Sequence, residues 1–199
     1  MSTISRFFSV ILSPLLMPTY GVLVALSLTI LCMIPSDAAT IVTLVIFALT
    51  CVVPSLVVFT MKMLGFVSDY SISNRKQRPI PYLATISAFI VAALYINAVE
   101  APQWLSLYFL AGAGAALTAF IINWWWKISA HLSGIGGLLA LLVNLQYNEL
   151  TLIDITPLIY IGIIATGMLG TARLYLNRHT FWQVIFGFLN GFLWVYLLK

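Results

Sequence analysis

Residues 173–183 read R-L-Y-L-N-R-H-T-F-W-Q, and the rest of the chain is organised around this stretch. It holds two arginines and one of the two histidines in the chain. The apolar segments 157–176 and 180–198 adjoin it, and each is about 20 residues long, the length of a helix that crosses a membrane. Polar groups beside hydrocarbon are costly, so a cluster of them there indicates function. The stretch is therefore predicted to be a functional turn between two membrane-spanning helices.

The composition of the whole chain supports a membrane protein. Of the 199 residues, 62% are hydrophobic and 7% are charged. A soluble domain of this size cannot bury so much apolar surface. The apolar segments are continuous and do not alternate with a period of two, so they favour helices over a barrel. The sequence predicts an all-α integral membrane protein, a single domain over residues 1–199, with a bundle of about six to seven transmembrane helices.

Polar turns divide the chain into apolar segments. The expected helices cover residues 7–33, 38–64, 80–99, 104–122, 129–147, 157–176 and 180–198. The first continues past two prolines and is too long for a cleaved signal peptide, so it is interpreted as a retained helix. The second is expected to kink near Pro54, because proline interrupts the hydrogen bonds of a helix.

Helix parity places three polar clusters on one membrane face: residues 65–79, 123–127 and 173–179. The cations expected on this face are Arg6, Lys62, Arg75, Lys76, Arg78, Lys127, Arg173 and Arg178. The opposite face has Asp37, Glu100, Glu149, Asp154 and Lys199. The positive-inside rule then predicts that the site faces the cytoplasm. The membrane is expected to be a bacterial inner membrane. Cations that bind an anionic substrate would bias the count in the same way on either face.

The side chains on the cationic face exclude several chemistries. Apart from Asp69 there is no carboxylate, so the carboxylate pair of a glycosidase is absent. Two histidines in separate loops are too few for a zinc site, and dispersed charges do not form a nucleic-acid footprint. No metal, cofactor or nucleic acid is therefore expected. Arginine with histidine favours phosphate chemistry, because guanidinium groups bind phosphoryl oxygens while imidazoles attack phosphorus or protonate a leaving oxygen.

Three motifs resemble the signature of the type 2 phosphatidic acid phosphatases, lipid phosphatases related to vanadium haloperoxidases. That signature reads K-x6-R-P, then P-S-G-H, then S-R-x5-H-x3-D. Here residues 71–79 read S-I-S-N-R-K-Q-R-P, residues 128–131 read I-S-A-H, and residues 172–183 read A-R-L-Y-L-N-R-H-T-F-W-Q. The motifs occur in the family's order and use both histidines of the chain.

The resemblance implies a role for each matched residue. His179 would be the nucleophile and His131 the general acid. Arg78 and Arg173 would hold the phosphate, together with the hydroxyl of Ser129 and the N-terminus of the helix that follows it.

The chain departs from the family at the aspartate of the third motif, where it has Gln183. An amide oxygen can accept a hydrogen bond from the ring N–H of His179 and so fix its tautomer. It cannot stabilise an imidazolium by charge, and loss of such a charge costs about 10⁴ in rate in the serine proteases.

A second departure lies at the lysine of the first motif, where the chain has Ser71. If residues 71–75 form one helical turn, Arg75 lies on the same face and can supply the cation. Lys76 and Lys127 are the other candidates for this charge.

The resemblance implies a metal-independent phosphatase that acts on a membrane lipid with a phosphate head group, such as a phospholipid or an isoprenoid diphosphate. The alternative is a weakened or inactive relative that binds anionic lipid phosphate without turnover, as the two departures suggest. A third hypothesis, a small transporter or channel, is disfavoured because the other face offers no matching polar residues within the helices.

Overall fold

The computed structural model describes the chain except for Met1, Ser71, Ser73, Lys199 and the side chains of Ser2, Ile4 and Arg6. The expectations about Ser71, Lys199 and the charge of Arg6 therefore lie outside the described residues. The described chain is helical apart from turns, loops and an isolated β-bridge between Thr29 and Thr151. The predicted all-α class is confirmed.

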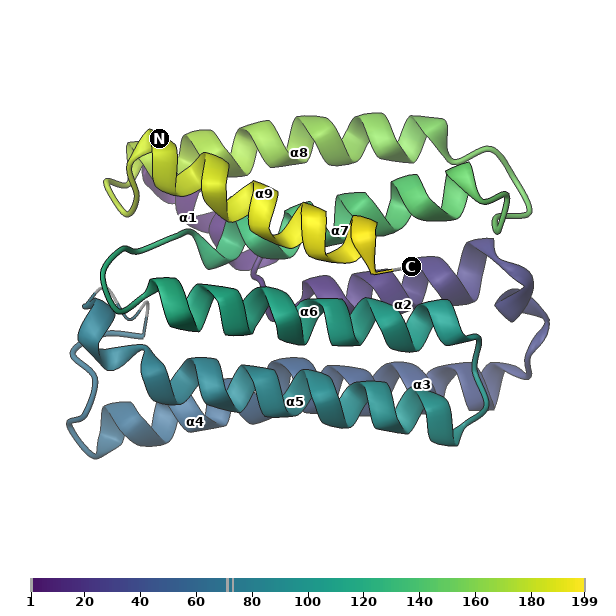
Figure 1. Ribbon diagram of the computed structural model, residues 1–199, viewed down its shortest axis with the longest axis horizontal. Helices are drawn as coiled ribbons and strands as arrows, with labels where there is room; N and C mark the ends of the chain where they lie inside the picture. Colours follow the sequence, from purple (N-terminus) through teal and green to yellow (C-terminus); the bar gives the residue numbers. More distant parts are fainter. Residues whose placement is uncertain (1, 71, 73, 199) are drawn as a thin grey trace.

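The longer helices run roughly alongside one another, and loops join them at the two ends of the bundle (Figure 1). In chain order the elements are α1 (Ser2–Ile11), α2 (Met17–Leu28), η1 (Ile30–Met33), α3 (Ser36–Phe47), η2 (Ala48–Val52), α4 (Val53–Met63), η3 (Arg75–Gln77), α5 (Pro79–Ala98), α6 (Gln103–Ile122), α7 (Ala130–Tyr147), α8 (Thr156–Tyr175) and α9 (Phe181–Leu197).

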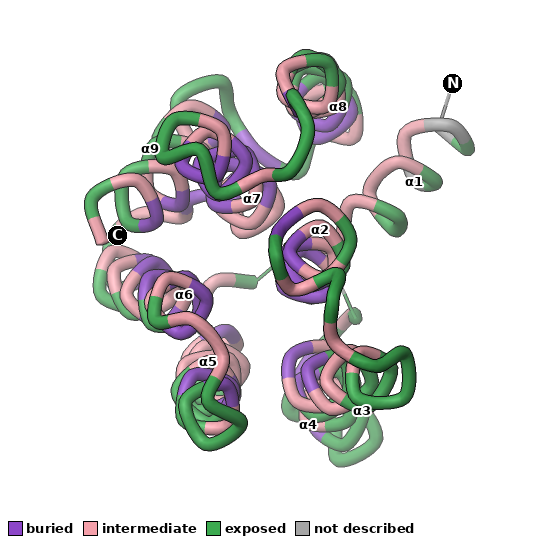
Figure 2. The backbone as a smooth tube through the Cα atoms, turned by 90° about the vertical axis from the view of Figure 1, so that its right-hand side faces the viewer, coloured by how far each residue is buried: buried purple, intermediate pink, exposed green. Residues whose placement is uncertain are grey.

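Several helices have the length and composition of membrane spans. Within the described residues, five are long and apolar enough to cross a membrane: the continuous helix Ser36–Met63, α5, α6, α7 and α8. The helices α2 and α9 are apolar but shorter. Figure 2 shows buried residues on the inward sides of the helices and exposed residues on their outward sides. Many of the exposed side chains are large and apolar, as expected for a surface covered by lipid.

The predicted first helix, residues 7–33, is wrong in its extent. The chain forms α1, leaves the helical conformation at residues 12–16 and resumes as α2. Pro14 lies in this break, because proline lacks an N–H donor and clashes with the preceding turn of a helix. Pro18 is tolerated because it lies in the first turn of α2, where the N–H groups have no helical partner.

The second predicted helix is continuous, and its irregular part precedes the proline. Residues 48–52 form a π turn, η2, directly before α4, which has Pro54 in its first turn. Wider turns of this kind accommodate a residue that cannot donate a backbone hydrogen bond. The irregular turn thus lies directly before the position at which the sequence predicted a kink.

Helices α7 and α9 pack with their backbones in contact. A Cβ atom on Gly191 would overlap the carbonyl oxygen of Ser133, and one on Gly187 would lie 2.6 Å from the carbonyl oxygen of Ser129. Asn190 Nδ2 also donates to Ser133 Oγ and to the Ala115 carbonyl, each at 3.0 Å. Close backbone approach and interhelical hydrogen bonds are the main source of helix association in lipid, so this pair is firmly held.

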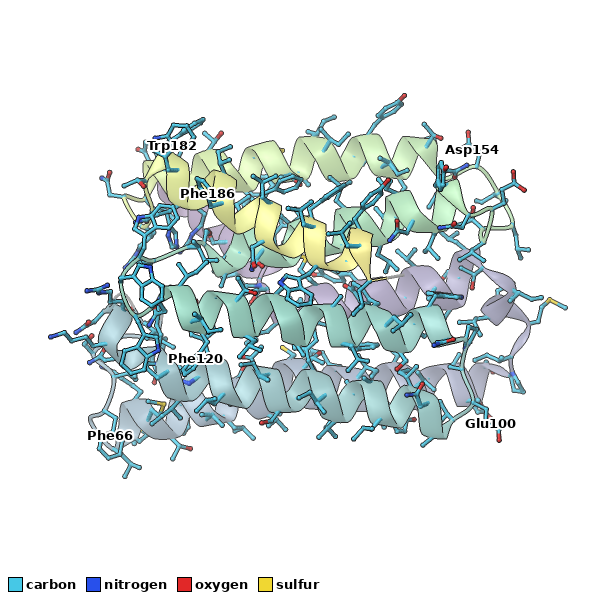
Figure 3. The ribbon with its side chains drawn as sticks, viewed as in Figure 1. Phe66, Glu100, Phe120, Asp154, Trp182 and Phe186 are labelled. Carbon is cyan, nitrogen blue, oxygen red and sulfur yellow. The ribbon has the colours of Figure 1, made fainter. Side chains whose placement is uncertain are left out.

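The two ends of the bundle differ in character. Three loops meet at one end, on the left in Figure 1: residues 64–78, 123–129 and 176–180. Figure 3 places Phe66 and Trp182 at this end and Glu100 and Asp154 at the opposite end. The three clusters predicted to share a membrane face therefore lie, in their described residues, at one end of the bundle.

Candidate active site

Hydrogen bonds join the three loops at this end of the bundle. Asn123 Nδ2 donates to the Arg75 carbonyl at 2.9 Å, and Arg75 Nη1 donates to the Trp124 carbonyl at 3.1 Å. Lys127 Nζ donates to the Arg178 carbonyl at 3.0 Å. The second loop is therefore tied to both of the others.

A cavity of about 940 Å³ lies inside this end of the bundle. Its polar lining includes Arg78, His131, Arg173 and His179. Arg78 directly precedes α5, His131 lies in the first turn of α7, Arg173 in the last turn of α8, and His179 shortly before α9. Four residues from three distant motifs thus share one space.

The cap of α9 fixes the tautomer of His179. Gln183 Oε1 accepts from the Thr180 N–H at 3.2 Å, as part of a capping box. The same atom lies 3.2 Å from His179 Nδ1. The N–H group of Thr180 can only donate, so the Gln183 atom that faces it is the oxygen. Because this oxygen can only accept, the hydrogen in its contact with His179 must be on Nδ1. The lone pair of neutral His179 is then on Nε2.

The surroundings of His179 favour its neutral form. The side chain is buried, and burial holds the pKa of His179 well below its usual range. The positive charges of Lys127, Arg173 and Arg78 lower this pKa further, while the hydrogen bond that His179 Nδ1 donates to Gln183 Oε1 opposes them. At neutral pH the imidazole is therefore uncharged, which is the form that acts as a nucleophile.

His131 has the opposite arrangement of ring nitrogens. Its Nε2 lies 3.1 Å from the carbonyl oxygen of Ser9 in α1. A carbonyl oxygen can only accept, so Nε2 carries a hydrogen. This ring nitrogen is suited to give a proton to an oxygen, and in this conformation it gives a hydrogen bond to the oxygen of Ser9.

The two arginines of the cavity are largely buried but keep donors available. Arg173 Nη1 donates to Ser9 Oγ at 3.5 Å, and its Nε is buried without a hydrogen-bond partner in the described structure. Arg78 Nε donates to the Ile72 carbonyl at 2.9 Å, and Tyr82, one turn along α5, hydrogen-bonds to the Arg78 side chain. A buried guanidinium with an unpaired N–H favours an anionic ligand.

The residue that accepts from Arg78 has a strained backbone. Ile72 has φ of 45°, which is unusual for a β-branched side chain. Strain of this kind costs roughly 1–3 kcal/mol and occurs mostly at functional sites. Here it accompanies the contact between the Ile72 carbonyl and the guanidinium of Arg78.

Three of the residues predicted to bind phosphate lie outside the cavity lining. Ser129 is fully buried, and its hydroxyl accepts from the Leu132 N–H as the N-cap of α7. Arg75 serves the contact between the loops. Lys76 is exposed. For Ser129 the same position that matches the family motif also meets the local need of a helix N-terminus.

Ser9, Tyr82 and Lys127 are close to the site although the motif match does not assign them a position. Tyr82 follows Arg78 by four residues, so helical spacing is a signal that could have found it. Lys127 was one of the cations considered as a substitute for the family lysine. Its charge lowers the pKa of His179, which indicates that it lies close to this histidine. Ser9 gives no signal, because its position depends on the break between α1 and α2.

No cluster of three or more His, Cys, Asp and Glu side chains suited to a metal ion occurs among the described residues. The site instead combines two imidazoles in different protonation patterns with two buried guanidinium groups. Such a set can bind an oxyanion, attack its central atom and protonate a departing oxygen.

Comparisons with protein-family models, with curated proteins and with solved structures found no match to this chain.

Proposed function

We propose that this protein is a metal-independent membrane phosphatase that hydrolyses a lipid phosphate or diphosphate through a phosphohistidine at His179. The observation that carries the proposal is the cavity that His179 shares with His131, Arg78 and Arg173. The resemblance to the type 2 phosphatidic acid phosphatases agrees with this set of residues.

The proposed reaction has two steps. Nε2 of neutral His179 attacks phosphorus and the bond to the lipid oxygen breaks. His131, which takes up a proton when the anionic substrate binds, gives its Nε2 proton to that oxygen. A water molecule then attacks the phosphohistidine and gives a proton to His131, which releases phosphate and restores both histidines. Arg78 and Arg173 stabilise the charge on the phosphoryl oxygens in both steps.

An apolar cavity supports a substrate with a hydrocarbon chain. A second cavity of about 120 Å³ lies between the helices and adjoins the first. The residues that line both cavities are Pro14, Leu15, Thr85 and Ala130. The rest of the second cavity is formed mostly by apolar and small residues, so a chain attached to a phosphate in the first cavity can extend into it.

We also propose that α2 and α9 complete seven crossings, with the site on the cytoplasmic side of a bacterial inner membrane. With 17 residues, α9 spans about 25 Å, close to the thickness of the hydrocarbon core. The cationic residues at the end that holds the site support this orientation. A maleimide that cannot cross the membrane should label Lys76→Cys from the cytoplasm, and labelling only from the opposite side would overturn the orientation.

Phosphate release from a panel of lipid phosphates, by purified protein in detergent with EDTA present, tests the proposed activity. We expect release from at least one lipid monophosphate or diphosphate. Release that depends on an added divalent ion would contradict the metal-independent mechanism. No release from any lipid would favour the binding-only alternative.

Gln183 decides between the enzyme and its inactive alternative. Gln183→Glu keeps the length of the side chain and places a carboxylate beside His179 Nδ1. We expect kcat to rise by about 10- to 100-fold, because a negative charge stabilises the positive imidazole ring of the phosphohistidine. The carboxylate should also raise the pKa of His179, so the acid limb of the pH–rate profile should move to higher pH.

Gln183→Leu is the matched control, since it removes the acceptor without adding charge, and it should lower kcat. If wild type and Gln183→Glu both bind lipid phosphate without releasing phosphate, the binding-only alternative gains support instead.

The pKa of Lys127 predicts where the pH–rate profile declines on its alkaline side. Partial burial, and then the charges of Arg78, Arg173 and Arg178, lower this pKa to about 8. The side chain is a cation below this pH and neutral above it, so kcat/KM for an anionic substrate should decline as the pH rises through about 8. In Lys127→Arg the charge persists, and the decline should move to higher pH.

Lys76→Arg is the control, because Lys76 is exposed and its charge is not among those that lower the pKa of His179. It should leave the alkaline limb where it is in the wild type. An unchanged limb in Lys127→Arg would show that another group titrates there.

A further inference from the structure

Helix α1 lies at the periphery of the bundle, beside α8 (Figure 2). The carbonyl oxygen of Ser9 accepts from His131 Nε2 at 3.1 Å, and its hydroxyl oxygen accepts from Arg173 Nη1 at 3.5 Å. Ser9 and Val10 also line the cavity. A single residue of α1 therefore contacts one histidine and one arginine of the candidate site.

Both atoms that Ser9 presents are oxygens that accept hydrogen bonds. In the proposed reaction, Arg173 donates to a phosphoryl oxygen and His131 gives its proton to the oxygen of the leaving group. Ser9 thus offers to each of these donors the kind of atom that the substrate would offer. While it does so, His131 Nε2 is not available to a leaving oxygen.

The connection of α1 to the bundle permits movement. Residues 12–16 separate it from α2 and include Pro14, so the two helices are not one rigid rod. Phe7, Val10 and Ile11 have exposed side chains. The end of α1 is held by a hydrogen bond from Tyr20 Oη to the Ile11 carbonyl, of 3.0 Å. A rotation at residues 12–16 would move α1 relative to α2 and would change its packing against α8.

We propose that α1 is an autoinhibitory strap, in which the two oxygens of Ser9 occupy the places of substrate oxygens until a phosphate group displaces them. This inference rests on the proposed phosphatase function. In this proposal the conformation described here is the resting state, and Ser9 must leave His131 before His131 can transfer its proton.

Orthovanadate, an analogue of phosphate, is the probe for the first test. Ser9→Ala removes the hydroxyl that competes for Arg173, so we expect vanadate to bind about two- to tenfold more tightly than to wild type, as loss of one competing hydrogen bond implies. Ser13→Ala is the matched control, since Ser13 lines the same cavity and has no side-chain contact with Arg173 or His131 among the described hydrogen bonds. It should bind vanadate as the wild type does.

The second test measures movement. Spin labels on Phe7→Cys and Tyr175→Cys, with Cys32 and Cys51 replaced by serine, report the distance between α1 and the end of α8 by pulsed electron paramagnetic resonance. Saturating vanadate should lengthen this distance. Both label positions are exposed, so the labels should not disturb the packing.

The outcomes separate the two proposals. If vanadate does not bind the wild-type protein, the phosphatase proposal fails and the strap fails with it. If vanadate binds but Ser9→Ala has wild-type or weaker affinity, and the distance stays constant, the strap is overturned while the phosphatase proposal stands.

Discussion

Replacement of His179 by alanine is expected to abolish phosphate release from lipid phosphates, with a loss of at least about 10⁴-fold in kcat. The reason is that the attack on phosphorus uses the Nε2 lone pair of neutral His179, which alanine lacks. Gln183, in the cap of α9, keeps this lone pair on Nε2. The measurement is phosphate release in detergent with EDTA present, beside the wild type.

His131→Ala provides the informative comparison. We expect it to lose activity on alkyl phosphates, whose leaving oxygen needs a proton, and to keep much of its activity on an aryl phosphate with an acidic leaving group. His179→Ala should lose activity on both. If His179→Ala still hydrolyses the aryl phosphate at the rate of the wild type, the nucleophile lies elsewhere.

The second large effect is expected at Gly191, where an added methyl group should destabilise the fold. In Gly191→Ala the new Cβ would overlap the Ser133 carbonyl, so α9 must move away from α7. We expect a cost of about 2–3 kcal/mol, and a thermal midpoint lower by about 5 °C or more in detergent. Activity should fall as well, because the hydrogen bond from the Ser129 N–H to the Gln183 carbonyl, of 3.0 Å, joins the same two helices next to the site.

Gly167→Ala is the matched control on α8. Nothing lies within 4 Å of the place that its Cβ would occupy. Alanine is favoured over glycine inside a helix by up to about 1 kcal/mol, so this variant should equal or exceed the wild type in stability. Equal thermal midpoints for both variants would contradict the tight packing of α7 against α9.

The arrangement of the polar loops could be predicted from the sequence because it depends on few properties. The apolar lengths fix the order of the later spans, and their parity brings residues 65–79, 123–127 and 173–179 to one end. The position of Gln183 beside His179 follows from helical spacing, since the two residues are four apart across the start of α9. These inferences required no knowledge of how distant helices pack.

Other features depend on tertiary contacts and could not be predicted. The extent of the first helix was wrong because its hydrophobicity continues through Pro14, although the backbone does not. Whether Arg75 faces the cavity or another loop is decided by the carbonyl of Trp124, which is 49 residues away along the chain. The contact of Ser9 with His131 joins residues 122 apart, and no local pattern specifies it.

The close packing of α7 against α9 separates the candidate site into two parts, the histidines and the arginines. His131 lies in the first turn of α7 and His179 directly before the N-cap of α9, so the two histidines are held by one closely packed pair of helices. Arg78 directly precedes α5 and Arg173 lies in the last turn of α8. Glycines of α8 face the side chains of Leu139 on α7 and Val184 on α9. Small movements of α8 would change the distance between Arg173 and a bound anion, while the distance between the two histidines would stay the same. In the proposed reaction, substitutions along α8 would therefore change the fit of the head group near Arg173 while leaving the two histidines in place.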